Sequence, residues 1–353
     1  GYLSGNRRQT VYRRAGDTFQ AITNTWAQYP IYGVADLDQD QLPDLVSMFP
    51  GGGSIQVWRN NGALNFSQTL LRFSRGVGAA TTADFDGDGI SDVLPHQSEF
   101  NQLFLGAAGL VFNPIEVPFA RASVFFVAPV DFDRDGVLDI AVSMSSNEPS
   151  VPAWSQTAVY RGHSLRTNHP PSSPANLRAT VLASDSVVLS WDRAADPEQA
   201  GDLTYNVRVG TSPGLGDVLS PMSLPDGCRL VPRRGNAWWN TKLFLTALQP
   251  ERAYYWSVQA VDNSFAGGPF AAEASFTLPE AFLALHPAST DELELELHAP
   301  PTGAWKIEVS NDLQSWREQM PMDVVVADGT NGNLRLKIDS SSQCRFFRAH
   351  RID

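Results

Sequence analysis

The sequence predicts an all-β protein assembled from several modules, of which the first is built from repeats. Three observations carry this prediction. An acidic motif recurs three times within the first 165 residues, each time between two short apolar runs. The later residues hold many runs in which apolar and polar side chains alternate, which is the pattern of half-buried strands. A segment rich in proline, serine and asparagine, "RTNHPPSSPANL" at residues 166–177, lies between these parts and is typical of a linker.

The bulk composition is that of a folded protein with more than one domain. A length of 353 residues suggests two or three domains, and 42% of the residues are hydrophobic. The formal net charge of −12 makes nucleic acids and anionic membranes poor candidate partners. No apolar run is long enough to span a bilayer, so we expect no transmembrane segment. We expect Cys228 and Cys344 to be small buried side chains.

The repeat has a regular length. The acidic motifs begin at Asp36, Asp84 and Asp131, so their spacings are 84 − 36 = 48 and 131 − 84 = 47 residues. Each unit contains about four short strands separated by turns rich in glycine and asparagine. This period with four strands per unit predicts β-propeller blades. A β-sandwich with a fortuitous repeat is the alternative.

The repeat region, residues 1–165, is predicted to be an incomplete propeller. The chain start, "TVYRRAGDTFQAI", matches the later part of a unit and is interpreted as the tail of a preceding repeat. Three units and a tail are fewer than the roughly four to eight blades of a propeller. Because the chain opens at Gly1 without a signal peptide, we expect it to be part of a longer protein whose N-terminal blades close the ring. An open stack is the alternative, and it would leave strand edges unpaired.

Each acidic motif has the pattern D-x-D-x-D-x-x-x-D. Four carboxylates on one tight loop repel one another unless a cation is shared, and Ca²⁺ accepts six to eight oxygen ligands. Mg²⁺ fits less well because it keeps more of its water. The predicted ligands are the four carboxylates and the position-7 carbonyl of each loop: Asp36, Asp38, Asp40, Asp44 and Leu42; Asp84, Asp86, Asp88, Asp92 and Ile90; Asp131, Asp133, Asp135, Asp139 and Val137.

Two other interpretations of the motif fit the sequence less well. A solvated acidic turn explains one copy, but three copies at constant spacing argue against it. An EF-hand needs a glutamate at position 12 and flanking helices, whereas position 12 here is Ser47, Pro95 and Val142 and the flanks resemble strands.

The motif and its surroundings resemble the calcium-loop repeats of the FG-GAP/VCBS family, found in integrin α-subunit propellers and many secreted bacterial proteins. The segments "TTADFDGDGISDVL" and "LFLGAAGLVF" match the family pattern along most of one blade. The resemblance implies one Ca²⁺ per loop, up to three in all. The first copy departs at position 6, where Gln41 replaces Gly89 and Gly136. A non-glycine residue in a left-handed backbone costs about 1–2 kcal/mol, so we expect the Asp36 loop to bind most weakly.

The segment at residues 170–279 is similar to a fibronectin type III domain. Val187, Leu189 and Trp191 alternate on one predicted strand, and "LQPERAYYWSVQAVDN" carries an L-x-P-x-x-x-Y frame ending at Tyr254. These positions match the core tryptophan and the tyrosine corner of such sandwiches. The departures are an acidic insertion, "RAADPEQAGD", and a long middle segment at residues 210–241. The resemblance implies a spacer or recognition module.

Two further features complete the chain. Trp238 and Trp239 are adjacent; on a strand they would face opposite sides, one in the core and the other exposed or against a neighbouring loop or domain. The alternative is a sugar-stacking platform, which makes both residues candidate ligand-binding residues. Residues 280–353 alternate in several runs and predict a small C-terminal β-sandwich, similar to modules that end large secreted bacterial proteins.

The chain shows none of the common catalytic motifs. We find no GxSxG, HExxH, P-loop or paired-cysteine metal pattern, and therefore expect no catalytic site in this segment. The resulting interpretation is a calcium-binding, secreted or cell-surface protein for adhesion or ligand binding, whose partner is an extracellular protein or a glycan. The alternatives are a lectin-like or accessory carbohydrate-binding part of a secreted polysaccharide-degrading enzyme, and a structural filament. The sequence identifies neither the ligand nor the oligomeric state.

Overall fold

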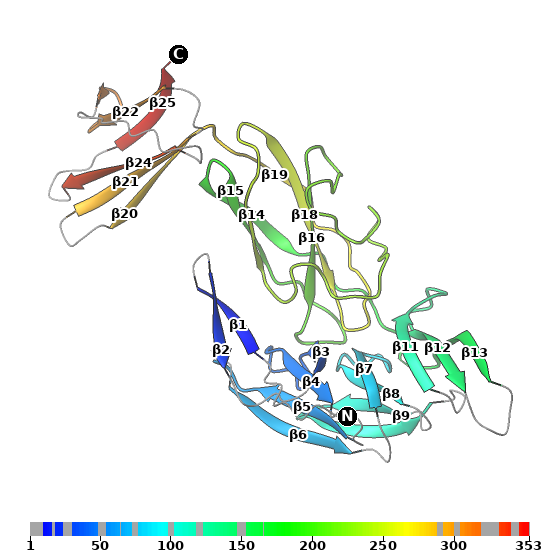
Figure 1. Ribbon diagram of the computed structural model, residues 1–353. Coiled ribbons are helices and arrows are strands. Elements are labelled where there is room, and N and C mark those ends of the chain that lie inside the picture. Colours follow the sequence, from blue (N-terminus) through cyan, green and yellow to red (C-terminus); the bar gives the residue numbers. More distant parts are fainter. Residues whose placement is uncertain are drawn as a thin grey trace.

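The structure is a computed structural model in which every regular element of the described residues is a β-strand (Figure 1). No helix in this part of the chain is long and apolar enough to cross a membrane. The structure describes residues 10–15, 18–23, 30–48, 54–63, 65–72, 77–97, 102–117, 123–146, 153–164, 166–287, 292–299, 304–318, 332–339 and 346–352.

The repeat region forms separate antiparallel sheets in which neighbouring strands follow one another along the chain. A hairpin comes first, then two four-stranded sheets, then a three-stranded sheet. The strands of these sheets are β1 (Thr10–Ala15) and β2 (Thr18–Thr23); β3 (Ile31–Ala35), β4 (Asp44–Met48), β5 (Ser54–Asn60) and β6 (Phe66–Arg72); β7 (Val77–Ala83), β8 (Asp92–Gln97), β9 (Gln102–Ala107) and β10 (Val111–Glu116); β11 (Ser123–Val130), β12 (Asp139–Ser146) and β13 (Trp154–Tyr160).

Consecutive sheets of the repeat region pack on one another through apolar side chains. The first two four-stranded sheets share a buried cluster that includes Leu37, Val57 and Phe104. The second four-stranded sheet and the three-stranded sheet share another buried cluster, which includes Phe85 and Met144. Contacts between β3 and β7 and between β7 and β11 align the first strands of the three units side by side. Each acidic loop joins the first and second strand of its unit, so this arrangement brings the three loops to one side of the row.

The middle module, made of β14 to β19, consists of two three-stranded sheets with one core. Trp191 is buried in this core, with its ring 5.6 Å from that of Tyr205. Tyr254 is buried, and its hydroxyl accepts the Gln249 amide at 2.8 Å. The core tryptophan and the corner tyrosine therefore lie as the sequence predicted. The strands are β14 (Ala175–Ala183), β15 (Ser186–Asp192), β16 (Thr204–Gly210), β17 (Lys242–Leu245), β18 (Ala253–Val261) and β19 (Ala274–Thr277).

The described part of the C-terminal module also forms two three-stranded sheets, ordered β20-β21-β24 and β23-β22-β25. Leu295, Leu297 and Ile307 make its buried cluster. The strands are β20 (Phe282–Pro287), β21 (Glu292–Ala299), β22 (Ala304–Ser310), β23 (Arg317–Glu318), β24 (Gly332–Asp339) and β25 (Phe346–Ile352).

The all-β prediction is confirmed, while the propeller is not, because the described strands form a row of sheets and no closed ring.

The prediction for Cys228 is wrong. This side chain is half-buried, and the Arg134 guanidinium donates to its sulfur at 3.2 Å. It lies in the long segment between β16 and β17, which stays close to the surface and has little core to enter. Cys344 lies outside the described residues.

Candidate metal sites in the acidic loops

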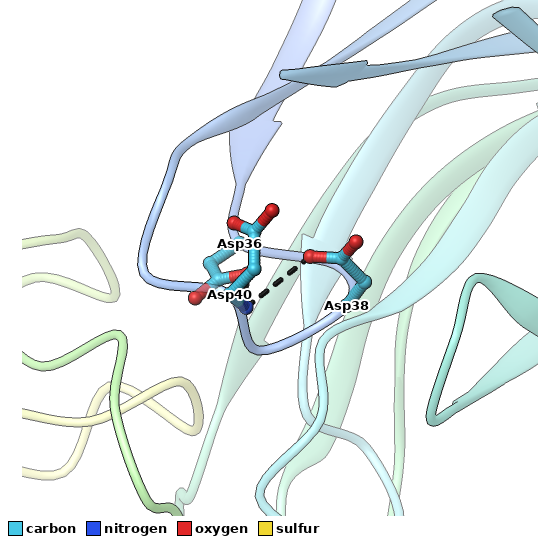
Figure 2. Close-up of side chains that lie close together, drawn as sticks. All are labelled: Asp36, Asp38 and Asp40. Atoms are coloured by element: carbon cyan, nitrogen blue, oxygen red, sulfur yellow. Dashed lines mark hydrogen bonds between the residues drawn. The ribbon is translucent and has the colours of Figure 1, made fainter. Parts of the chain in front are cut away.

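The three acidic loops, residues 36–44, 84–92 and 131–139, each bring carboxylate oxygens together. In each loop, one oxygen from each of three aspartates lies within 4.8 Å of the others. Oxygens on opposite sides of one Ca²⁺ are about 4.8 Å apart, so these clusters match the size of a shared ion. Figure 2 shows the first cluster, with its three carboxylates around a single turn. The clusters are Asp36, Asp38 and Asp40; Asp84, Asp86 and Asp92; Asp131, Asp133 and Asp139.

The position-1 carboxylate closes the turn in every copy. It accepts the backbone amides of positions 5 and 6, which a tight loop would otherwise leave without partners. The distances between amide nitrogen and carboxylate oxygen are 2.7–3.1 Å in the three copies: Asp36 with Asp40 and Gln41, Asp84 with Asp88 and Gly89, Asp131 with Asp135 and Gly136.

The position-9 carboxylate ties the loop to the third strand of its unit. One oxygen accepts the amide of position 2, and the other accepts an amide at or near the end of the third strand. The six distances are 2.7–3.0 Å: Asp44 with Leu37 and Asn60, Asp92 with Phe85 and Gly106, Asp139 with Phe132 and Gly162. This aspartate is therefore a structural residue as well as a candidate ligand.

Position 3 differs from the other three positions because the copies share no backbone hydrogen bond there. Position 5, in contrast, accepts the amide of position 7 in every copy, at 2.8–2.9 Å. In the second loop the position-3 residue is Asp86, and its Oδ1 is buried without a hydrogen-bond partner among the described residues. An unpartnered carboxylate oxygen aimed into an anionic loop is what a cation ligand requires, so the residues present fit a bound Ca²⁺.

The loop backbone is left-handed at two positions rather than one. At position 6, φ is +70° for Gln41, +83° for Gly89 and +82° for Gly136, as the glycine pattern indicated. Position 4 is left-handed too, including at Gln39 (+63°) and Arg134 (+60°). The sequence did not indicate the left-handed backbone at position 4, since two of the three copies lack glycine there.

Burial raises the pKa values of several loop carboxylates. The pKa of Asp92 rises to about 8 and that of Asp84 to about 6, mainly because they are removed from water. Burial also raises the pKa values of Asp36 and Asp44 to about 7. Neighbouring carboxylates raise these pKa values further, and hydrogen bonds from backbone amides lower them. Without a cation, ionisation of these groups weakens the folded state at neutral pH; a divalent cation would offset that cost.

An arginine lies beside each loop. Arg59 pairs with Asp38 and Asp40, and Arg161 pairs with Asp133 and Asp135. Arg59 lies near the end of β5, and Arg161 directly follows β13, so each is placed at the end of the third strand of its own unit. The second unit has Leu105 at the matching place, and its loop is paired instead with Arg166 of the linker, 3.4 Å from Asp88 and 3.7 Å from Asp86. All three arginines are exposed, so each pair contributes little by itself.

The position-7 residues Leu42, Ile90 and Val137 lie in the loops, with their amides bonded to position 5. A role for their carbonyls as ligands stays a prediction.

The two tryptophans do not lie on a strand: they occupy a turn between β16 and β17, with their ring centroids 5.5 Å apart. Neither is a core residue. Trp238 is 49% exposed, and Trp239 is half-buried beneath Arg234 and donates to Asp202.

Two faces of the middle module approach the loops. The first loop and the acidic insertion border a small cavity of about 200 Å³ that reaches Tyr205 and Trp239. The third loop and the segment around Cys228 border a larger one of about 710 Å³, with Phe132 and Leu230 among its lining residues. No sequence pattern indicated this packing.

Comparisons with known proteins agree with the order of modules. The family model for an FG-GAP-like repeat matches residues 36–94, and the model for a fibronectin type III domain matches residues 172–277. No curated protein sequence matches the chain.

Similar solved structures include fibronectin domains and an enzyme. The FN1–FN3 domains of chicken CNTN1 are 12% identical, with 90% of this chain and 88% of that chain covered and a TM-score of 0.23. The third fibronectin III domain of human KIAA0343 is 22% identical, with 36% and 95% covered and a TM-score of 0.24. Chitinase ChiA74 from Bacillus thuringiensis is 17% identical, with 52% and 27% covered and a TM-score of 0.21. On the family matches, the chain carries an FG-GAP-like repeat followed by a fibronectin type III domain.

Proposed function

We propose that this chain is a calcium-stabilised extracellular module for adhesion or ligand binding, without a catalytic site of its own. The observation that carries the proposal is the repeated loop frame. In each copy, positions 1, 5 and 9 bond to the backbone, and the position-3 carboxylate converges with two others on one point. FG-GAP-like repeats and fibronectin domains are the accompanying modules, and both suit a secreted or cell-surface protein.

Calcium is favoured over magnesium by the donor set. Each loop offers carboxylate oxygens and backbone carbonyls from a short flexible turn, and Ca²⁺ accepts such irregular shells of six to eight oxygens. Mg²⁺ demands a near-octahedral shell and usually keeps several waters. We propose one ion per loop, with the first loop the weakest because Gln41 holds a left-handed backbone.

The test is calcium titration of the full chain by calorimetry, combined with thermal unfolding. We expect saturable binding of up to three Ca²⁺ and a lower melting temperature in EDTA. Adding Ca²⁺ in excess over EDTA should restore the melting temperature, and Mg²⁺ at the same concentration should not. A melting curve that ignores EDTA, together with no heat of binding, would refute the calcium proposal.

A second candidate function is carbohydrate binding, as in a lectin-like or accessory part of a polysaccharide-degrading enzyme. The half-exposed Trp238 ring beside Trp239 favours it, because flat aromatic faces with a polar neighbour suit sugar rings. A glycan array with wild type and Trp238→Ala tests the idea. Leu230→Ala, at a 61% exposed apolar site, is the control. Binding that only Trp238→Ala abolishes supports the sugar site; binding to proteins alone supports adhesion.

A further inference from the structure

The second acidic loop is bonded directly to the middle module through its own backbone. The Asp84 amide donates to the Asn263 carbonyl at 3.0 Å, and the Ser264 hydroxyl donates to the Asp84 carbonyl at 3.0 Å. The Asn263 side-chain amide reaches the Gly89 carbonyl at 3.3 Å. Asn263 and Ser264 lie in the turn after β18, separated from the strand by Asp262, and are 1% and 8% exposed. The bonds therefore lie in a closed interface, out of contact with water.

The acidic insertion of the middle module covers the other side of this loop. A Cβ atom added to Gly89 would lie 2.3 Å from the Glu198 carbonyl oxygen, so the two backbones are in direct contact. Gln199 is 4% exposed and accepts the Asn263 amide at 3.0 Å. Gln199 of the insertion thus positions Asn263, which in turn bonds to the loop. This contact gives a physical role to a segment that departs from the usual fibronectin pattern.

The end of the repeat region and the start of the linker cover the third side. The Ser164 hydroxyl donates to the Asp86 carbonyl at 2.6 Å, and Arg166 pairs with Asp86 and Asp88. The Arg166 carbonyl lies 3.2 Å from where a Gly87 Cβ would be. Consequently, positions 1, 3, 4, 5 and 6 of the second loop all contact residues beyond the repeat region.

We infer that the second acidic loop is a cation-dependent joint: a divalent cation bound there fixes the middle module on the repeats, and its removal frees the two parts. The inference rests on the proposed calcium binding. Its basis is that Asp84 is both a candidate ligand and a partner of Asn263 and Ser264. Repulsion among four uncompensated carboxylates displaces the backbone groups that make the interface bonds, and a shared cation holds them in place.

Thermodynamic linkage requires the converse as well. If the cation stabilises the interface, then the interface raises affinity for the cation by the same factor. The second loop is expected to be the one whose affinity falls when the interface is weakened. The other two loops contact the middle module mainly through side chains, such as Gln41 with Arg193 and Arg134 with Cys228.

The test measures a distance across the joint in the full chain by double electron–electron resonance. Spin labels are placed at Asn113→Cys on β10 and Lys242→Cys on β17, two exposed sites, with Cys228→Ser and Cys344→Ser removing the native thiols. Calcium binding is measured on the same samples by calorimetry. We expect one narrow distance peak in Ca²⁺ and loss of that peak in EGTA.

Matched variants assign the effect to the second loop. Asp86→Asn should lose one bound Ca²⁺ and lose the narrow peak even in Ca²⁺. Asp133→Asn, at the same position of the third loop, should lose one Ca²⁺ and keep the peak. Ser264→Ala leaves every loop carboxylate in place, so it should keep the number of bound ions and broaden the peak.

The outcomes separate the two proposals. Calcium binding with an unchanged distance distribution in EGTA would overturn the joint and leave the calcium proposal standing. A narrow peak that Asp86→Asn keeps and Asp133→Asn loses would also overturn it. Absence of calcium binding by the wild-type chain would overturn both.

Discussion

The second and third acidic loops share one motif and one hydrogen-bond frame but have different surroundings. In the second loop, Asp84 is 2% exposed and lies under the middle module. In the third, Asp133 and Asp135 are exposed, and the loop borders a cavity of about 710 Å³. Its backbone contact beyond the repeat region is with the linker, where the Asn168 amide donates to the Gly136 carbonyl at 2.9 Å.

The difference shows that the motif determines the shape of the loop and the neighbouring modules determine what the loop controls. Both loops offer a cation similar oxygens. Binding at the second loop acts on the interface between modules, whereas binding at the third acts on its own sheet. Three comparisons between the loops, and one pH comparison at the interface beside the second loop, test this distinction.

The largest effect is expected from removing the position-9 carboxylate. Asp92→Ala leaves the amides of Phe85 and Gly106 buried without acceptors, at a cost of about 2–4 kcal/mol of unfolding free energy. Asp139→Ala leaves the amides of Phe132 and Gly162, which lie nearer to solvent, and should cost about half as much. Urea unfolding in EDTA measures both without a contribution from metal. Equal losses would contradict the claimed difference in burial.

Replacing the position-6 glycine should lower the stability of the protein less than removing the position-9 carboxylate. Gly89→Ala combines left-handed strain with a Cβ 2.3 Å from the Glu198 carbonyl oxygen. Gly109→Ala is the control, since Gly109 has φ +80° and nothing within 4 Å, and strain alone costs about 1–2 kcal/mol. Gly136→Ala should lie between them, because Thr167 of the linker can turn away. The comparison fails if Gly89→Ala and Gly109→Ala lower the melting temperature equally.

A pH effect is expected at Asp262, the residue before Asn263. It is 1% exposed, and burial raises its pKa to about 8. Asn168 and the Ala266 amide bond to its carboxylate and act in the opposite direction. Other charged groups that influence it are Asp196, Asp84 and Arg229.

Because the folded-state pKa of Asp262 lies above the unfolded value, the group favours the folded protein when protonated. This contribution is present at low pH and is lost as pH rises from about 4 to about 8. Asp262→Asn cannot ionise, so its stability relative to wild type should be lowest near pH 4 and should rise by on the order of 1–3 kcal/mol by pH 8.5. Urea unfolding at the two pH values is the measurement. A variant that loses stability equally at both values would show that the carboxyl is not titrating.

The smallest effect is expected from the arginines. Arg166→Ala and Arg161→Ala each remove an exposed partner of two carboxylates, and ion pairs this exposed contribute little to stability. Both should change the melting temperature little in Ca²⁺. Arg166→Ala should broaden the distance distribution across the joint slightly, and Arg161→Ala should not. A loss with Arg166→Ala as large as that of Asp92→Ala would mean that the linker, not the loop, holds the interface.

The sequence predicted the parts of the molecule that depend on local pattern. The motif spacing indicated three equivalent loops, the glycines indicated the left-handed position 6, and Trp191 and Tyr254 indicated the middle module. These features follow from periodicity and turn chemistry, which act over a few residues.

The features that the sequence did not reveal depend on distant partners. Asn263, Ser264 and Glu198 belong to no motif, and their importance comes only from the repeat that packs on them. The structural role of the position-9 aspartate was also hidden, because its partners Asn60, Gly106 and Gly162 lie 14–23 residues further along the chain.

The hydrogen bonds of the position-9 aspartate have a consequence for the order of folding. They span 7–23 residues, so each repeat can close its own loop while only a short length of chain is available. The bonds from Asn263 and Ser264 to the second loop span 174 and 180 residues. Contacts between distant segments wait until both segments exist and carry the larger loop-closure entropy. We therefore expect the repeats to assemble first, with the finished second loop as the surface on which the later module docks.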